Sequence, residues 1–362
     1  MYQKVYQVTS QIARTTLCLS AAVLFVACKT TEPALPAPVI TGSPSPAPIV
    51  EPTKPAPPPP LFIPARPTAE RMGEALIRAA GNHAVLMSQI NLIPTEEIRS
   101  PDHMNQTMDG LSQVYSPSLG PALIGYGALI GAQNSDFAEG VIETARYQGI
   151  DSVVYQLYMD PNYAASMPGA IFASADIQNA WASDIAAISR SGEHIKSQSY
   201  SLQKQAKWKK LKTDSRAKRL EAIGRAQSIR FKPPQHTAQQ IAEVGTIRAD
   251  DGAAAQKRQQ FWRTYGRNSA PRSQTFQSQY NSPIHRKALT LSALEILGAT
   301  SAESSKWIEN YMTSPKLNQC VNTARLNTEQ CIAAGHFKYE DAFCMAEHQL
   351  KEISNCLTSS VL

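Results

Sequence analysis

The chain has 362 residues, 43% of them hydrophobic and 18% charged, with a formal net charge of +6. Lys and Arg number 6 against 14 Asp and Glu over residues 70–203, 17 against 5 over 204–272, and 7 against 8 over 273–362. The composition therefore excludes a uniformly basic chain and places the positive charge in one segment. Residues 70–362 are long enough for one large domain or two smaller ones.

The first 27 residues have the pattern of a secretory signal. Residues 1–16 are polar and carry Lys4 and Arg14, and an apolar run follows over residues 17–27. This run suits a signal core but is far shorter than the roughly 20 residues that a membrane-spanning helix needs. We therefore expect residues 1–27 to be a signal peptide that is removed on export.

The residues around the expected cleavage point resemble a known motif. Phe25, Val26, Ala27 and Cys28 resemble the lipobox of bacterial lipoproteins, in which Leu is the usual residue at the first position. The resemblance implies that Cys28 becomes the N-terminus and carries acyl chains, which would hold the protein on a membrane. By the same resemblance, Lys29 favours the outer membrane, with the folded part facing the periplasm. The alternative is that Cys28 is an apolar residue of a signal or of a buried helix.

A proline-rich segment follows the expected anchor. Residues 33–67 contain 14 prolines in 35 positions, four of them consecutive. Proline lacks an amide donor and fixes φ, so this composition favours polyproline II over helix or central strand. We expect residues 28–69 to be a lipidated N-terminus and a disordered linker, with a reach on the order of 100 Å when extended. Docking of the proline run to an aromatic groove is the alternative function.

Helical patterns begin at residue 70, and the first covers residues 70–91. The glycines that follow at Gly125, Gly127 and Gly131 form a weak phosphate-loop pattern, but no strand pattern precedes them. We therefore interpret them as positions where two helices approach closely.

A shorter helix is predicted over residues 135–148. Asp136 and Glu139 form a start that resembles a capping box, and Gly149 is a suitable terminator.

A long amphipathic helix is predicted next. Trp181, Ile188, Ile195 and Leu202 stand seven residues apart, which is compatible with a coiled-coil partner or with an ordinary bundle core. The helical pattern continues through the basic residues, so we expect residues 70–232 to form a helical domain that ends in a long basic helix.

The basic helix carries the candidate binding residues. Residues 204–232 contain eleven Lys and Arg but only Asp214 and Glu221 as acids. Such a surface can bind an acidic envelope protein, an anionic cell-wall polymer or a lipid headgroup, and the alternative is a solvated helix face. Export argues against nucleic acid. The candidate contacts with an anionic partner are Lys204, Lys207, Lys209, Lys210, Lys212, Arg216, Lys218 and Arg219.

Residues 233–282 are polar and poor in aliphatic side chains, so we expect a flexible or loosely packed segment there. Residues 283–362 form the C-terminal helical region, which contains the four cysteines left after the signal and anchor are accounted for. An even set of cysteines in an exported chain indicates two disulfides.

The cysteine spacing predicts an antiparallel helical hairpin. Pairing Cys331 with Cys344 and Cys320 with Cys356 centres both pairs on one turn. The arrangement resembles hairpins of the coiled-coil-helix-coiled-coil-helix type, which implies a clamp and no activity. Zinc bound by Cys344 with His336 or His348 is the alternative, but structural zinc sites use closer ligand spacing.

Catalytic motifs are weak. Ser201 and Lys204 match the spacing of penicillin-binding enzymes, and Glu303 with Ser304 resembles a pair in helical lytic transglycosylases, but the accompanying motifs are absent from the sequence. We therefore assign no catalytic residue, metal or cofactor. The sequence predicts an all-α, lipid-anchored and non-enzymatic component of the bacterial cell envelope that tethers or assembles other molecules. The alternatives are a peptidoglycan hydrolase or its regulator, and a subunit of an envelope-spanning machine.

Overall fold

The computed structural model describes residues 73–213, 215–245 and 282–361. Within these ranges the regular elements are helices, and the extended backbone pairs only in an isolated bridge between Lys212 and Phe337. The all-α prediction is therefore confirmed for this part of the chain. The predicted signal peptide, Cys28 and the proline-rich linker lie outside the described residues, as do residues 246–281.

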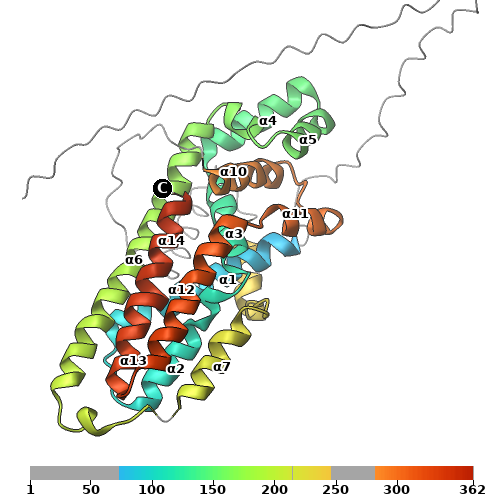
Figure 1. Cartoon of the computed structure of the whole chain (residues 1–362). Helices are drawn as coiled ribbons and strands as arrows, with labels where there is room; N and C mark the ends of the chain where they lie inside the picture. The colour runs from blue at the N-terminus through green and yellow to red at the C-terminus, as the bar shows by residue number, and fades with distance from the viewer. Residues whose placement is uncertain (1–72, 214, 246–281, 362) are drawn as a thin grey trace, which may run out of the picture. The chain divides into compact units, whose positions relative to one another are not determined.

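Helix α3 (Leu119–Ala132) lies at the centre of the fold (Figure 1). It packs against α1 (Glu74–Leu92), α6 (Ala170–Lys204) and α10 (Pro283–Ile296). Residues 119–131 of α3 are buried except for Pro121, because a helix with neighbours on several sides needs an apolar surface all round.

The three glycines of α3 each face a different neighbouring helix. A Cβ atom on Gly125 would lie 2.6 Å from the Ala79 Cβ of α1, and one on Gly127 would lie 2.5 Å from the Trp181 ring of α6. A Cβ atom on Gly131 would meet the Ser292 hydroxyl of α10 at 2.4 Å. Any side chain here would push helices apart, so the close-packing interpretation of these glycines is confirmed.

Helix α6 is 35 residues long and links the two ends of the fold. Its four heptad residues are buried, and the helix packs against α3 through Ile177 and Trp181 and against the C-terminal helices further along. Gly192 permits the second of these contacts, because a Cβ atom there would lie 3.2 Å from the Ala346 carbonyl oxygen. The seven-residue spacing is therefore accounted for by a core within this chain.

Helices α4 (Ser135–Gln148) and α5 (Ile150–Met159) lie beside the N-terminal end of α6 (Figure 1). The predicted terminator Gly149 separates them, with a φ of 86° that favours glycine. The cap of α4 differs from the prediction: the Asn134 side chain accepts a hydrogen bond from the Phe137 amide at 3.0 Å. Asp136 instead stands in the first turn, where the negative charge of a carboxylate interacts favourably with the helix dipole.

The prediction that one long helix continues through the basic residues to 232 is wrong. Helix α6 ends at Lys204, a short 3-10 turn covers Trp208–Lys210, and a separate helix α7 covers Arg216–Ala226. The polar segment is also partly ordered, since α8 (Gln235–Gly245) packs against α1. The helical pattern continues across the basic residues and so does not reveal the chain reversal after α6, and the polar composition of residues 233–282 does not reveal α8.

The remaining helices are α2 (Pro101–Leu111), α11 (Ser305–Tyr311) and the C-terminal hairpin. The first arm of the hairpin is α12 (Pro315–Ala334). The second arm is a continuous run of α13 (Lys338–Cys344), a π-helical segment (Met345–Lys351) and α14 (Glu352–Val361). This second arm lies along α6 (Figure 1), so the hairpin is part of the main helical core.

Candidate functional site

The hairpin brings together the two cysteine pairs that the spacing predicts. Cys320 and Cys356 are paired with their Cα atoms 5.7 Å apart, and Cys331 and Cys344 are paired at 5.6 Å. The inner pair holds the turn between the two arms. Because Cys344 is in a disulfide, it does not supply the zinc ligand of the alternative interpretation. Across the described ranges, no group of three or more His, Cys, Asp and Glu side chains is placed to hold a metal ion.

The lysine turn, defined here as residues 204–213, begins where α6 ends. The backbone of Gln205 is extended, a 3-10 turn covers Trp208–Lys210, and the Trp208 side chain is buried. Burial of a large aromatic side chain contributes about 1.5–3 kcal/mol, whereas continuing the helix would align several lysines in solvent. The turn is therefore a reversal that exposes its lysines around a buried tryptophan.

The lysine turn is fastened to the turn of the hairpin. Lys212 forms a backbone bridge with Phe337, and its ammonium group lies 4.9 Å from the centre of the Phe337 ring. The Lys338 amide donates a hydrogen bond to the Leu211 carbonyl oxygen at 2.9 Å. These contacts join the lysine turn to the region that the inner disulfide holds, so the exposed lysines stand on a constrained support.

A buried charge cluster fixes α7 beneath the lysine turn. Arg219 of α7 and Asp341 of α13 form an ion pair of 2.7 Å, and Lys338 lies 3.2 Å from the same carboxylate oxygen. Lys338 also donates to Asn105 of α2 at 2.7 Å and to the Ser215 hydroxyl at 2.9 Å. Burial raises the pKa of Asp341, and the two adjacent cations oppose that shift.

The structure divides the eight predicted contact residues into two groups. Arg219 is 2% exposed and pairs with Asp341, so its prediction as a surface contact is wrong. Arg216 is half-buried and donates to the Gly335 carbonyl oxygen, so it too stabilises the fold. The exposed members are Lys204, Lys207, Lys209, Lys210, Lys212 and Lys218.

An aromatic hollow of about 360 Å³ opens beside the lysine turn. Sequence patterns give no sign of it, because its walls come from α6 and from both arms of the hairpin. The Tyr200 and Phe343 rings lie 6.4 Å apart between their centres. The walls include Tyr200, Gln203, Cys331, Tyr339, Phe343 and Cys344. The hollow therefore has largely aromatic walls, with the backbone-bonded carboxylate of Glu340 on one side and the exposed lysines beyond Gln203.

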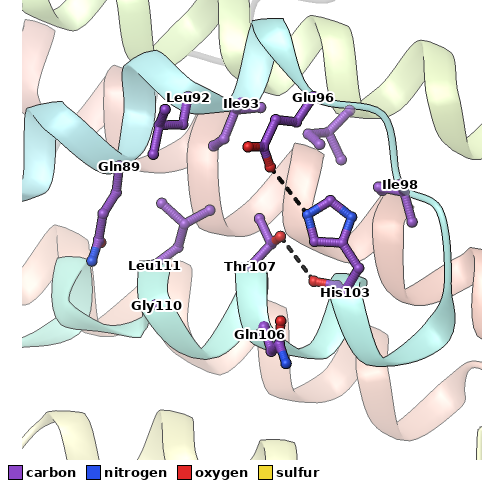
Figure 2. A pocket seen from close by; sticks show the side chains of 11 residues that line it. Gln89, Leu92, Ile93, Glu96, Ile98, His103, Gln106, Thr107, Gly110 and Leu111 are labelled. Atoms are coloured by element: carbon purple, nitrogen blue, oxygen red, sulfur yellow. Dashed lines mark hydrogen bonds and ion pairs between the residues drawn. The ribbon is translucent and has the colours of Figure 1, made fainter.

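A second hollow of about 260 Å³ lies between α1 and α2 (Figure 2). Its floor includes Ile98 and Leu111, and on its rim His103 Nε2 lies 3.2 Å from a carboxylate oxygen of Glu96. The Thr107 hydroxyl donates to the His103 carbonyl oxygen, as Figure 2 shows. The side chains of Glu96 and His103 on this rim therefore bond to each other.

The residues of the weak catalytic motifs do not form a site. Ser201 and Lys204 are exposed at the end of α6, and Glu303 is exposed on a one-turn 3-10 helix. The core contains a different pair, in which His83 Nε2 lies 2.9 Å from Asp184 and the imidazole stacks on Tyr126. Both members of the pair are buried, so they join α1 to α6 inside the core.

No helix in the described ranges has both the length and the apolar character that crossing a membrane requires. Comparisons with protein families, curated proteins and solved structures found no match for the chain.

Proposed function

We propose that the protein is a lipid-anchored, non-enzymatic component of the cell envelope that holds an anionic partner through its lysine turn. The observation that carries this proposal is the exposure of five lysines within residues 204–212 on a support that the inner disulfide constrains. The anchor is the lipid predicted at Cys28, and the proline-rich segment is the spacer.

The charge arrangement supports binding to an anionic surface. Residues 204–213 contain five lysines and no acidic residue, so the charge within the turn itself is entirely positive. Several like charges on one short loop raise the local positive potential and attract anionic partners, an effect that salt screens over about 8–10 Å. The constrained turn also reduces the entropy that these groups lose when they bind.

The test is charge reversal in the lysine turn of the mature chain made without the predicted lipid (residues 29–362), so that the anchor does not itself hold the protein on the envelope. We expect K207E/K209E/K210E to lower binding to isolated envelopes about tenfold or more at low salt, because each basic group contributes to the electrostatic attraction. High salt should weaken binding of the unmodified protein and leave the variant nearly unchanged. Measurement is by sedimentation of envelopes from cells that express the unmodified chain, followed by quantification of the epitope-tagged protein that they bind.

A charge-matched control separates the turn from net charge. Lys306 and Lys316 are exposed and lie on α11 and α12, away from the lysine turn. K306E/K316E should reduce binding far less than K207E/K210E, a double variant of the turn that changes the net charge by the same amount. Equal losses in the two variants, or no salt dependence in the unmodified protein, would contradict a specific role for the lysine turn.

A further inference from the structure

The α4–α5 end of the fold exposes a group of large apolar side chains. Of the ten large apolar residues that are exposed in the described ranges, six belong to residues 147–172. Tyr147 is the most exposed, at 92%. The others are Ile150, Tyr155, Met159, Ile171 and Phe172. Gatherings of this kind mark surfaces that bind another protein, and tyrosine is among the residues that contribute most to such interfaces.

The same end is acidic. Residues 135–176 carry six carboxylates against the single cation Arg146. Glu143 and Asp151 stand four positions before and after Tyr147, and both are exposed. The α4–α5 end therefore combines a projecting aromatic ring with negative charge, so a suitable partner offers an apolar recess with positive charge beside it.

The C-terminal end of α6 has an aromatic hollow next to the lysine turn. The aromatic hollow is lined by Tyr200, Tyr339 and Phe343, and the first exposed lysine of the lysine turn, Lys204, follows the lining residue Gln203. Glu340 also lines the hollow, but its carboxylate accepts hydrogen bonds from the backbone amides of His336 and Phe337. The positive charge of the lysine turn is thus opposite in sign to that of the α4–α5 end, and the hollow beside it is lined by aromatic rings.

The two surfaces cannot meet within one chain. Phe172 lies in the first turn of α6 and Tyr200 in its last turns, and this stretch of continuous helix separates them by about 42 Å. Helix α6 is held against α3 and the hairpin, so it does not bend the ends together. Contact between the surfaces therefore requires two molecules.

We propose that the anionic partner of the lysine turn is the α4–α5 end of a second copy of this chain, with Tyr147 seated in the aromatic hollow. The inference rests on the proposed function, because it names the partner of the same lysine turn. The contact joins different surfaces of the two copies, so repetition gives a ring if the rotation closes and an open chain if it does not.

The first experiment places a photoreactive benzoyl-phenylalanine at position 147 of the full-length protein in cells. Illumination should give a covalent dimer, and its joined peptide should contain residues 199–212 or 331–344 of the other copy. The same group at Leu326, which is exposed on α12 outside both surfaces, should give no such dimer. Joining of position 147 to residues 33–67, to the α4–α5 end of another copy, or to no copy at all would overturn the proposal.

The second experiment is a charge exchange between the two ends. E143K/D151K and K207E/K210E should each lower the dimer yield about tenfold, because each creates like charges across the contact. Co-expression of the two variants, or the four changes together in one chain, should restore the dimer. Failure of this restoration would contradict the pairing of these two ends.

The outcomes for the two proposals remain distinct. If position 147 gives no dimer while K207E/K209E/K210E still loses envelope binding, the lysine turn binds an anion other than this chain. The proposed function then stands and the second-copy contact is rejected. If charge reversal changes neither measurement, both proposals are rejected.

Discussion

Glu295, near the end of α10, is a buried carboxyl group with an unusual environment. It is 4% exposed, and the Thr300 hydroxyl donates a hydrogen bond to it. Burial raises the pKa of Glu295 from 4.5 to about 7, against the opposing effect of the Thr300 bond. The folded protein therefore holds this proton more tightly than the unfolded chain does.

This difference predicts a specific loss of stability with rising pH. The contribution of Glu295 is fully present below about pH 4.5, falls as the pH rises toward 7, and is constant above that. As the pH rises across this window, ionisation of Glu295 should lower the free energy of unfolding by about 3 kcal/mol. The E295Q variant should not show this pH-dependent loss. Urea unfolding followed by circular dichroism at several pH values measures both proteins.

The exposed neighbour Glu303 supplies the matched control for this prediction. E303Q removes a carboxylate from the surface, so its pH profile should follow that of the unmodified protein. Parallel profiles for E295Q and the unmodified protein would show that Glu295 is not the titrating group.

At the scale of elements, the two disulfides have different tasks. The inner pair encloses a sequence separation of 13 around the hairpin turn, and the outer pair encloses 36 further from that turn. Removal of either pair should lower the free energy of unfolding by roughly 3–4 kcal/mol, because each restricts the unfolded chain. The inner pair alone adjoins the residues that fasten the lysine turn.

We therefore expect C331A/C344A to loosen the lysine turn and C320A/C356A to leave it in place. The Thr213 amide donates to the His336 carbonyl oxygen across this junction, so its hydrogen exchange reports the contact directly. Exchange at Thr213 should be faster in the first variant than in the second when the two have been matched for global stability with urea. Equal exchange would mean that the inner pair does not constrain the turn.

At the scale of the whole molecule, the sequence predicts what depends on local spacing. The helical class, the cysteine pairs and the packing role of the α3 glycines all follow from periodicity and small side chains. Arg219 shows the limit of such reasoning, because its burial depends on Asp341, which is far along the chain. Trp208 is a second case, since it is buried just after the end of α6 although no glycine or proline in residues 204–210 marks that end.

The aromatic hollow could not be predicted for the same reason. Tyr200 and Phe343 come from helices that only the hairpin geometry brings together, and single exposed aromatic residues have no periodic signature. The positive charge of the lysine turn could be predicted from composition, whereas its conformation could be learned only from the fold.

Close packing around α3 predicts that replacing glycine by alanine has opposite effects on stability at Gly127 of α3 and at Gly224 of α7. Ala at position 127 should lower the free energy of unfolding by about 1–2 kcal/mol, because overpacking against buried Trp181 outweighs the gain in helix propensity. A Cβ atom on Gly224 of α7 would instead meet no neighbouring side chain or helix within 4 Å, so G224A should raise stability by about 0.5–1 kcal/mol. Urea unfolding of both variants measures the two values. If G127A were as stabilising as G224A, the helices around Gly127 would not be closely packed, and the core described for α3 would be wrong.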